Sequence, residues 1–434
     1  MTKTISFYTL GCRLNQSETA VIERTFEHDG YKVVDFEEPA DIVVINTCTV
    51  TENGDNDTRR LVQKINRLNP QARVALIGCQ AQIQKEKLTR WPNVRWVIGN
   101  AVKMDLKSII ENDVGATRRV APTIMTPTIP RKPFTIPTAG LDRHHTRANI
   151  KIQDGCDFFC SFCEIPYARG RARGRVFEDI LLEANALVSA GHKELIITGI
   201  NVGTYSYEGY SLLHVVEALE KIQGLERVRI SSIEPTTIPR ELIGKMGQPS
   251  KLCRHLHVPL QSASNEILKL MKRKYTLEEF DEFIHLAYSS VPQICLGTDV
   301  IVGFPGETEE LFQQTYEYLK NSPLHYFHVF SYSKRMLAKS RGTACRAPTA
   351  NEIQRRSAIL RNLSQRKRHL FYESFLGSRQ KVIFEQKKDG LWPGLTDHYV
   401  RVKVKSEQFL SKQLLNIQLE KIEGQTVIGN EISI

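Results

Sequence analysis

Three cysteines stand close together in the segment CDFFCSFC, which follows a predicted strand. Cys156, Cys160 and Cys163 are separated by three and then by two residues. Structural zinc sites favour paired C-x₂₋₄-C ligands with two further ligands, whereas a cubane iron–sulfur cluster takes a thiolate at each iron. The spacing therefore favours a 4Fe-4S cluster with one iron open to a substrate or cosubstrate. The alternative is a structural zinc loop completed by a histidine such as His144 or His145.

A second set of three cysteines occurs near the start of the chain, each at the end of a predicted strand. Cys12, Cys48 and Cys79 follow ISFYTL, DIVVINT and RVALIG, and helical patterns over about 16–28 and 57–68 separate these strands. Alternating strands and helices indicate a parallel sheet, whose carboxyl ends face one crevice. We therefore expect the three thiols to converge, although 36 and 31 residues separate them along the chain. Three buried thiols that pack as small hydrophobes are the alternative.

The other cysteines and the composition indicate a globular protein from a reducing compartment. Cys253, Cys295 and Cys345 have no comparable placement and are expected to be core residues or inert thiols. Nine cysteines in 434 residues are too few for a disulfide scaffold. No apolar run reaches the length of a membrane span, and the start, MTKTISFYTLGC, lacks the shape of a signal peptide. The sequence therefore predicts a cytoplasmic protein with no membrane partner.

The positive charge of the chain is concentrated in one stretch. The formal net charge is +11, and residues 331–370 hold eleven Lys or Arg against a single acid, Glu352. A helix is predicted from about 349 to 371, with arginines over most of its surface. Its apolar stripe comprises Ile353, Leu360, Leu363 and Leu370. Such a local excess of cations predicts a polyanionic partner.

The pattern of predicted elements divides the chain into three domains. Residues 1–116 are expected to form a parallel, Rossmann-like α/β domain, and residues 117–141, rich in Pro and Thr, a linker. Residues 142–371 contain about six β/α units and end in the basic helix, which favours a partial (β/α)6 barrel. Residues 375–434 contain short strands joined by polar turns, typical of a small all-β barrel. The predicted fold class is therefore α/β with a carboxyl-terminal β domain.

Taken together, these motifs resemble those of the radical S-adenosylmethionine methylthiotransferases. The C-x₃-C-x₂-C loop at the first strand of a partial barrel is similar to that of radical S-adenosylmethionine enzymes, and the order of three domains covers the whole chain. LGCRLNQSE and NTCTVT resemble the branch that acts on N6-threonylcarbamoyladenosine in tRNA. CSFCEIPYARGRARGR, SSIEP, HLHVPLQSAS and TDVIVGFPGET also follow the family closely. Departures are Ala263, where Gly is usual, and a longer segment around 334–342.

The resemblance implies a tRNA-modifying enzyme with two 4Fe-4S clusters and S-adenosylmethionine as radical source and methyl donor. The cluster on the CDFFCSFC loop is expected to cleave S-adenosylmethionine to methionine and a 5′-deoxyadenosyl radical, after reduction by a donor such as a flavodoxin or ferredoxin. The auxiliary cluster on the other three cysteines is expected to carry the sulfur that is methylated and transferred to adenine C2 of N6-threonylcarbamoyladenosine at tRNA position 37. No side chain beyond the cluster ligands is assigned a catalytic role, and the oligomeric state is left open.

The resemblance and the predicted strand ends also suggest residues that bind the cosubstrate and RNA. Candidates for S-adenosylmethionine, which plain turns or structural roles would explain as well, are Thr198, Gly199, Asn201, Ser231, Glu234, Gln261 and Asp299. RNA contacts are expected from arginines beside the cluster loop and on the basic helix, and from aromatic residues of the terminal domain, which resembles the TRAM-type RNA-binding barrel. These are Arg169, Arg171, Arg173, Arg175, Arg355, Arg356, Trp392 and Tyr399. A solvated basic face is the alternative for the arginines.

Other functions account for parts of the pattern. The same chemistry on isopentenyladenosine in tRNA, or on an aspartate of a ribosomal protein, fits the six cysteines but agrees less well with the amino-terminal motifs. The concentrated positive charge also argues against a protein substrate. A non-catalytic RNA-binding metalloprotein explains the charge, but it does not explain why both cysteine sets offer three ligands.

Overall fold

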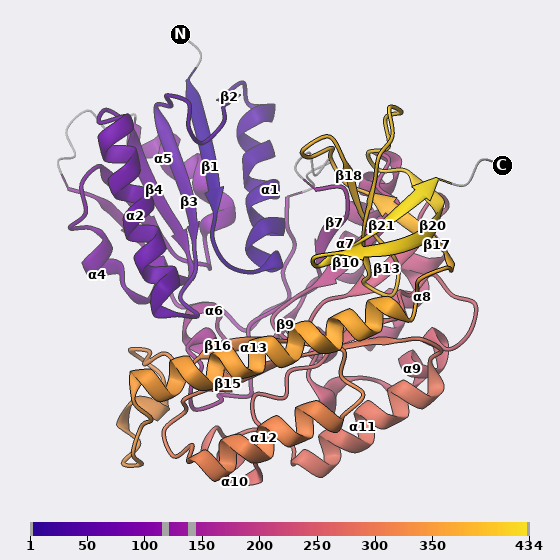
Figure 1. Ribbon diagram of the computed structural model, residues 1–434. Helices are drawn as coiled ribbons and strands as arrows, with labels where there is room; N and C mark the ends of the chain where they lie inside the picture. The colour runs from indigo at the N-terminus through magenta and orange to yellow at the C-terminus, as the bar shows by residue number, and fades with distance from the viewer. Residues whose placement is uncertain (1–2, 115–120, 138–144, 432–434) are drawn as a thin grey trace. The chain divides into compact units, whose positions relative to one another are not determined.

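The computed structural model describes residues 3–114, 121–137 and 145–431, and the chain divides into two compact units (Figure 1). The first unit comprises Met1–Leu141, Lys151–Glu183 and Ser333–Arg341. The second comprises Asp142–Ile150, Ala184–Tyr332 and Gly342–Ile434. His144 and parts of the expected linker, 117–120 and 138–141, lie outside the described residues. No helix among the described residues combines the length and the apolar character needed to cross a membrane.

The first unit contains a parallel sheet of six strands in the order β2-β1-β3-β4-β5-β6, which confirms the predicted α/β class. The strands are β1 Thr4–Thr9, β2 Lys32–Val33, β3 Ile42–Thr47, β4 Arg73–Gly78, β5 Val94–Ile98 and β6 Thr123–Met125. Every residue of β3 is buried, because helices cover both faces of this central strand. Strand β6 lies within the segment expected to be a linker, and it extends the sheet by pairing with β5.

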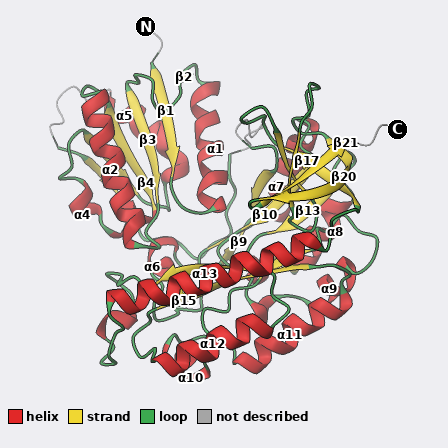
Figure 2. Ribbon diagram, in the orientation of Figure 1, coloured by secondary structure: helices red, strands yellow, loops and turns green. Residues whose placement is uncertain are grey.

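Helices pack on both faces of this sheet and create two separate apolar cores (Figure 2). One core lies under α1 Arg13–His28, the 3-10 turn η1 Lys103–Asp105 and α5 Leu106–Val114. The other lies under α2 Glu52–Leu68, α3 Cys79–Ile83 and α4 Lys85–Leu88. The two-sided cover fixes the strand ends, so the loops that follow β1, β3 and β4 begin from rigid positions.

The remaining part of the first unit surrounds the CDFFCSFC loop. The short antiparallel pair β8 Gln153–Asp154 and β9 Arg173–Gly174 flanks the loop and helix α6 Ile165–Arg169. Helix α7 Phe177–Ser189 begins in this unit. The segment 333–341, which includes most of the 3-10 turn η4 Lys339–Gly342, belongs to the same unit although it is distant in sequence.

The second unit contains the predicted six parallel strands, in two three-stranded sheets of order β13-β10-β7 and β14-β15-β16. They are β7 Ala148–Lys151, β10 Glu194–Thr198, β13 Arg227–Ile230, β14 His255–His257, β15 Cys295–Val302 and β16 Tyr326–Ser331. A parallel bridge joins Val228 of β13 to Leu252 in the segment that leads into β14. The intervening helices are α8 Leu212–Glu220, α9 Arg240–Met246, α10 Asn265–Leu270, α11 Leu277–Ser290 and α12 Glu309–Asn321. This arrangement is an open β/α barrel, as predicted.

The basic helix and a closed β-barrel complete the second unit. Helix α13 Ala350–Glu373 begins with a capping box formed by Thr349 and Glu352. Leu370, predicted to lie on its buried stripe, is 64% exposed, and Phe371 is buried instead. The barrel closes in the order β17-β18-β19-β21-β20. Its strands are β17 Arg379–Phe384, β18 Trp392–Leu395, β19 Arg401–Val404, β20 Leu414–Glu423 and β21 Thr426–Glu431.

Candidate functional site

Cys12, Cys48 and Cys79, called here the auxiliary trio, lie at the carboxyl ends of three neighbouring strands. Cys12 follows β1 and caps α1, Cys48 directly follows β3, and Cys79 follows β4 and begins α3. The residue before Cys12 is Gly11, with φ of +95°, and a Cβ atom there would lie only 2.9 Å from the Sγ atom of Cys48. A side chain at position 11 would therefore fill the space beside this thiol.

The thiols of the auxiliary trio influence one another. Burial, with a smaller contribution from the neighbouring thiols of Cys79 and Cys12, raises the pKa of Cys48 to about 12. The Nδ2 atom of Asn100 lies 3.6 Å from the Sγ atom of Cys79 and also donates to a backbone carbonyl at 2.7 Å. Because a metal binds thiolates, a cation or cluster that compensates this burial is the chemistry that the trio favours.

Cys156, Cys160 and Cys163, called here the loop trio, lie on a loop whose backbone donates toward sulfur. The backbone N–H of Phe158 lies 3.4 Å from the Sγ atom of Cys156, and that of Ile165 lies 3.5 Å from the Sγ atom of Cys163. N–H groups directed at sulfur stabilise thiolate ligands of iron–sulfur clusters.

Glycine is required where the loop begins. Gly155 has φ of +72°, and a Cβ atom on it would lie 2.1 Å from the carbonyl oxygen of Arg171. Cys156 then donates its N–H to the carbonyl of Gly170 at 3.1 Å, which closes the loop at its base. These backbone contacts fix the start of the loop that carries the loop trio.

The openness of both trios distinguishes a cluster from a single metal ion. Within the described part of the chain, only His257, Asp299 and His328 bring three ligand atoms within 4.8 Å of one another, so neither trio does. Sulfur ligands of one tetrahedral zinc ion lie about 3.8 Å apart, because each Zn–S bond is about 2.3 Å. Six thiols in two open groups of three therefore fit cubane clusters better than structural zinc.

Arg169 connects the segment after the loop trio to the auxiliary trio. This residue ends α6, which packs on α3 through Ala168, Ile83 and Cys79. The guanidinium of Arg169 is fully buried, and its Nε atom donates to the Sγ atom of Cys79 at 3.2 Å. No part of the Arg169 side chain reaches solvent, which argues against the predicted contact of this residue with RNA.

Buried acids surround the guanidinium of Arg169. It donates to Glu18 at 2.9 Å, to Asp154 at 3.0 Å and to the side chain of Asn15 at 2.5 Å. Burial alone would raise the pKa of Glu18, but Arg169, Lys103 and Lys151 hold it well below its ordinary value. Three cations, Arg169, Lys103 and Lys151, and two carboxylates, Glu18 and Asp154, thus form one buried ion cluster. Each ion in this cluster depends on its partners.

A second network connects the loop trio to the auxiliary trio through segment 333–341. Glu164, directly after Cys163, accepts hydrogen bonds from Thr49 at 3.2 Å and from the backbone N–H of Leu337 at 2.6 Å. Buried Arg335 donates to Asp55 at 2.7 Å, to Thr49 at 2.9 Å and to Glu164 at 3.4 Å. Thr49 directly follows Cys48, so two cysteine ligands have immediate neighbours in the same network.

Arg173 and Arg175, two further predicted RNA contacts, are also buried in ion pairs. Arg173 donates to Asp154 at 3.1 Å. Arg175 pairs with Asp179 at 2.5 Å and also with Glu183. These ion pairs argue against the predicted RNA contact, more strongly for buried Arg175 than for Arg173, whose side chain is 9% exposed. The basic run after the loop is a set of structural cations, and only Arg171, with 52% of its side chain exposed, faces solvent.

The two arginines predicted to contact RNA from the basic helix also differ in exposure. Arg356 is buried, donates to Glu307 at 2.9 Å and packs on the ring of Phe312. The burial of Arg356 therefore argues against the predicted RNA contact. Half of the Arg355 side chain is exposed, and this residue stays a candidate for a phosphate contact.

The two aromatic residues predicted to stack on bases differ in exposure, since Trp392 is buried and Tyr399 is partly exposed. Trp392 is 4% exposed and donates its indole N–H to the carbonyl of Ser406 at 3.1 Å. Tyr399 stacks on the ring of His255 with 4.2 Å between centroids. Burial of Trp392 argues against stacking on a base at that ring, whereas Tyr399 is partly exposed, and stacking there stays a prediction. Phe409, which is 72% exposed and lies edge-on to Trp392, is the accessible aromatic that the sequence did not single out.

The predicted cosubstrate contacts near β10 have structural partners. Thr198 is buried and donates to the carbonyl of Ile150 at 3.3 Å. The side-chain oxygen of Asn201, also buried, accepts a hydrogen bond from Thr237 at 3.0 Å. Gly199 is partly exposed between them. Side-chain contact with a ligand is therefore less favoured at Thr198 and Asn201 than backbone contact around Gly199.

The other predicted cosubstrate residues lie at the ends of β13 and within β14–β15. Glu234 pairs with Arg273, and burial raises the pKa of Glu234 in spite of this ion pair. Gln261 adopts a left-handed conformation with φ of +70° and pairs with β15 at Val300. Ser231 is partly exposed next to β13, and Asp299 lies in β15 between two histidines.

Comparisons with known proteins agree with this architecture. The profile of the radical SAM superfamily matches residues 150–319, and that of uncharacterized protein family UPF0004 matches residues 4–99. The open barrel and the loop trio thus define a radical SAM protein. The solved structure of the radical S-adenosylmethionine methyltransferase TsrM from Kitasatospora setae, with cobalamin and a 4Fe-4S cluster bound, shares the fold. Its TM-score is 0.56 at 17% identity, over 76% of this chain and 75% of that one.

Two curated relatives carry the name threonylcarbamoyladenosine tRNA methylthiotransferase MtaB. The protein from Aquifex aeolicus is 39% identical over 92% of this chain and 96% of its own length. The protein from Bacillus subtilis is 35% identical over 99% and 98%. A tRNA-2-methylthio-N(6)-dimethylallyladenosine synthase from Thermodesulfovibrio yellowstonii is 31% identical over 98% of both chains. The chain belongs to the radical SAM methylthiotransferase family, in its threonylcarbamoyladenosine tRNA branch.

Proposed function

We propose that this enzyme transfers a methylthio group to adenine C2 of N6-threonylcarbamoyladenosine at position 37 of tRNA, giving the 2-methylthio nucleoside. The observation that carries the proposal is the presence of two open cysteine trios in one compact unit, joined by Arg169 and by the Glu164–Arg335 network. A radical enzyme that only activates S-adenosylmethionine needs one such trio, whereas sulfur insertion gives the second one a role.

The choice of base modification is supported by the relatives. The two quoted proteins named for threonylcarbamoyladenosine are 39% and 35% identical to this chain, and the quoted dimethylallyladenosine synthase is 31% identical. The isopentenyladenosine substrate and a ribosomal-protein aspartate are correspondingly disfavoured. The names of the quoted methylthiotransferases and of the quoted synthase all refer to tRNA. We infer that the substrate is tRNA in the cytoplasm.

The residues of this chain have distinct roles in the proposed reaction. The loop trio would hold one 4Fe-4S cluster and the auxiliary trio a second, and their thiol chemistry and open spacing fit both. When bound, the clusters and S-adenosylmethionine supply the one-electron and sulfur chemistry. Arg169 and Arg335 hold the two cysteine-bearing segments in register, and their buried ion pairs exclude water between these segments. An external one-electron donor such as a flavodoxin or ferredoxin completes the proposal.

Cosubstrate contacts are proposed at strand ends of the barrel, and RNA contacts are proposed for exposed side chains. Ser231, Gly199 and Gln261 are candidates for S-adenosylmethionine because they occupy strand ends of the barrel. For RNA, the exposed cations Arg171 and Arg355 and the exposed ring of Phe409 take the place of the buried residues that the sequence indicated. Arginine forks suit phosphate groups, and an exposed ring suits stacking on a base.

Mass spectrometry of tRNA nucleosides tests the proposal. Deleting the gene should remove 2-methylthio-N6-threonylcarbamoyladenosine and leave its unmethylthiolated precursor in tRNA. A plasmid copy with Cys48→Ala should fail to restore the product, whereas a Cys345→Ala copy should restore it, because Cys345 is exposed and belongs to neither trio. Unchanged product in the deletion strain would overturn the tRNA assignment. Loss of 2-methylthio-isopentenyladenosine alone would overturn the choice of base.

A further inference from the structure

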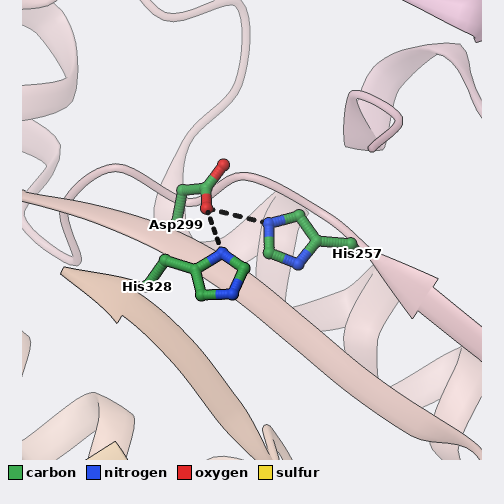
Figure 3. A group of neighbouring side chains, drawn as sticks. All are labelled: His257, Asp299 and His328. Carbon is green, nitrogen blue, oxygen red and sulfur yellow. Dashed lines mark hydrogen bonds and ion pairs between the residues drawn. The ribbon is translucent and has the colours of Figure 1, made fainter. Parts of the chain in front are cut away.

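Two histidines and one aspartate of the second unit converge (Figure 3). His257 ends β14, Asp299 lies in β15, and His328 lies in β16, so three adjacent parallel strands each contribute one side chain. Their ligand atoms all lie within 4.8 Å of one another, a convergence that no other group of described histidine, cysteine or acidic residues reaches.

The separations within this group match those of ligands on one metal ion. The Oδ1 atom of Asp299 lies 2.9 Å from Nε2 of His257 and 3.2 Å from Nδ1 of His328. Metal–nitrogen and metal–oxygen bonds to zinc are both about 2.1 Å, so two such ligands lie about 3.0 Å apart at a right angle and about 3.4 Å apart in a tetrahedron. The two measured separations lie within or next to this range.

A second layer of side chains orients His257. Its Nδ1 atom lies 3.1 Å from the hydroxyl of Tyr326, and the same hydroxyl lies 2.8 Å from Nε2 of His255. The ring of His255 in turn stacks on Tyr399. Metal-binding histidines commonly use their second ring nitrogen in this way, which fixes the ring and leaves the other nitrogen for the metal. The orientation of His257 therefore does not depend on Asp299 alone.

His328 gives the group access to solvent. Its side chain is 51% exposed, while those of His257 and Asp299 are largely covered. The ring of His328 stacks on that of His257 with 5.0 Å between centroids, which holds both imidazoles on one side of the carboxylate. The group is thus covered by protein at His257 and Asp299, and it is open at His328 to water or to a ligand oxygen.

We propose that His257, Asp299 and His328 form a binding site for one divalent first-row transition metal ion, with the remaining coordination positions open. Two histidines and one carboxylate with open positions are the donor set of mononuclear non-haem iron sites, and imidazole and carboxylate also suit zinc and cobalt. The site uses none of the six cysteines, and the proposal does not depend on the proposed tRNA substrate. Its open positions would take water or an oxygen donor such as a carboxylate or hydroxyl group.

Cobalt(II) is the probe for the test, because it is counted separately from cluster iron. The full chain with its clusters in place is equilibrated with cobalt(II), freed of unbound metal, and analysed for cobalt and iron by mass spectrometry. Wild type is expected to hold one cobalt per chain. His328→Ala and Asp299→Asn are expected to bind it at least tenfold more weakly with unchanged iron. X-ray absorption at the cobalt edge should show imidazole nitrogen and oxygen ligands without sulfur.

His285→Ala provides the matched control, because His285 forms an exposed pair with Asp281 on α11 but has no second histidine partner in that pair. This variant should bind cobalt as wild type does. Thermal unfolding checks that the variants fold, and half-exposed His328 is the position whose replacement disturbs packing least. Cobalt binding unaffected by both substitutions, or sulfur in the cobalt coordination shell, would overturn the proposal. So would a wild-type chain that retains no cobalt.

Discussion

The Nε atom of Arg169 donates a hydrogen bond to the Sγ atom of Cys79 over 3.2 Å. Arg169 lies six residues after Cys163 in sequence, so one buried side chain joins the segment of the loop trio to a member of the auxiliary trio. Hydrogen bonds to ligand sulfur raise the reduction potential of a cluster, and a nearby cation stabilises the added electron. The two trios are therefore coupled through protein groups, independently of any substrate.

Replacing Arg169 should change the reduction potential of the auxiliary cluster while the protein still folds. Arg169→Lys keeps a positive charge opposite Glu18 and Asp154 but loses the planar donor to Cys79. We expect a more negative reduction potential for the auxiliary cluster, with a loss of about 2 kcal/mol in unfolding free energy from the missing charged hydrogen bonds. Redox titration followed by electron paramagnetic resonance gives the potential, and iron analysis gives the occupancy.

The exposed neighbour Arg171 supplies the control for this experiment. Arg171→Lys alters a half-exposed side chain that pairs with Asp157 and touches neither trio's sulfur. Its cluster potentials should equal those of wild type. If Arg169→Lys leaves the potential unchanged at full iron occupancy, the contact with Cys79 has no electronic role.

Each trio should be required for a different measurable step of the reaction. Replacing the loop trio with alanine should remove about four of roughly eight irons per chain and abolish formation of 5′-deoxyadenosine. Replacing the auxiliary trio should remove a similar amount of iron but leave 5′-deoxyadenosine formation, while methylthiolation stops. Anaerobic reconstitution, iron and sulfide analysis, and chromatography of the products provide the readouts. Equal loss of 5′-deoxyadenosine in both variants would contradict the division of labour.

Arg335 should matter for activity more than for cluster assembly. Arg335→Met removes the buried donor that joins Asp55, Thr49 and Glu164, and it leaves two buried carboxylates without this partner. We expect a loss of about 3 kcal/mol in stability and at least a tenfold drop in methylthiolation, since the two cysteine segments lose their register. Lys334, the exposed neighbour of Arg335, serves as the control. Lys334→Ala should retain both the stability and the methylthiolation activity of wild type. Single-turnover kinetics at equal iron content would expose a purely structural effect.

Sequence patterns located the six cysteines because strand periodicity is a local property. Cys12, Cys48 and Cys79 follow short apolar runs, and a parallel sheet brings such strand ends together without further information. The same reasoning gave the six strands of the open barrel and the closed terminal barrel. Local sequence pattern was sufficient to predict the position of a residue wherever that position depends on the course of the backbone.

Burial of charge, in contrast, was not predictable from local pattern. Arg169 and Glu18 are 151 residues apart, and Arg335 and Asp55 are 280 residues apart. An arginine in a basic run has the same local sequence whether it faces solvent or an acid from another element. Its role depends on long-range packing, which also explains why Trp392 was expected at the surface.

The stability of the second unit should fall in mild acid because of His325. Burial, with a smaller effect from Lys367, lowers the pKa of His325 from 6.5 to about 4. Its Nδ1 atom accepts the backbone N–H of Leu296 at 3.0 Å, which requires the neutral ring. The unfolded chain takes up this proton below pH 6.5 and the folded chain only near pH 4, so stability is full above 6.5 and declines between these values. We expect a loss of about 2 kcal/mol, reduced from the full linkage value by partial solvation.

Comparison with a non-titrating variant isolates this effect from other acid-sensitive groups. His325→Asn retains an acceptor for the backbone N–H of Leu296 but takes up no proton. Its unfolding temperature, measured by calorimetry, should fall less than that of wild type between pH 7 and pH 4.5. His285→Asn, at a half-exposed position, should follow wild type. Parallel curves for His325→Asn and wild type would contradict the assignment.

Replacing Phe409 should weaken RNA binding, whereas replacing Trp392 should lower the stability of the protein. The ring of Phe409 is 72% exposed and lies 5.5 Å from that of Trp392, which is buried in the terminal barrel. Phe409→Ala should weaken tRNA binding roughly 5- to 100-fold, the range for loss of one stacked base, with no change in unfolding temperature. Trp392→Ala should instead cost about 3 kcal/mol in stability, because it leaves a cavity.

Binding is measured by fluorescence anisotropy with labelled tRNA at one fixed salt concentration, because phosphate contacts make the affinity salt-dependent. Tyr288→Ala is the matched control, since Tyr288 is also an exposed aromatic residue but lies on α11, outside the terminal barrel. Its affinity for tRNA should equal that of wild type. Equal binding by Phe409→Ala and Tyr288→Ala would exclude base stacking at this ring, and the exposed cations Arg171 and Arg355 would then carry the RNA contact alone.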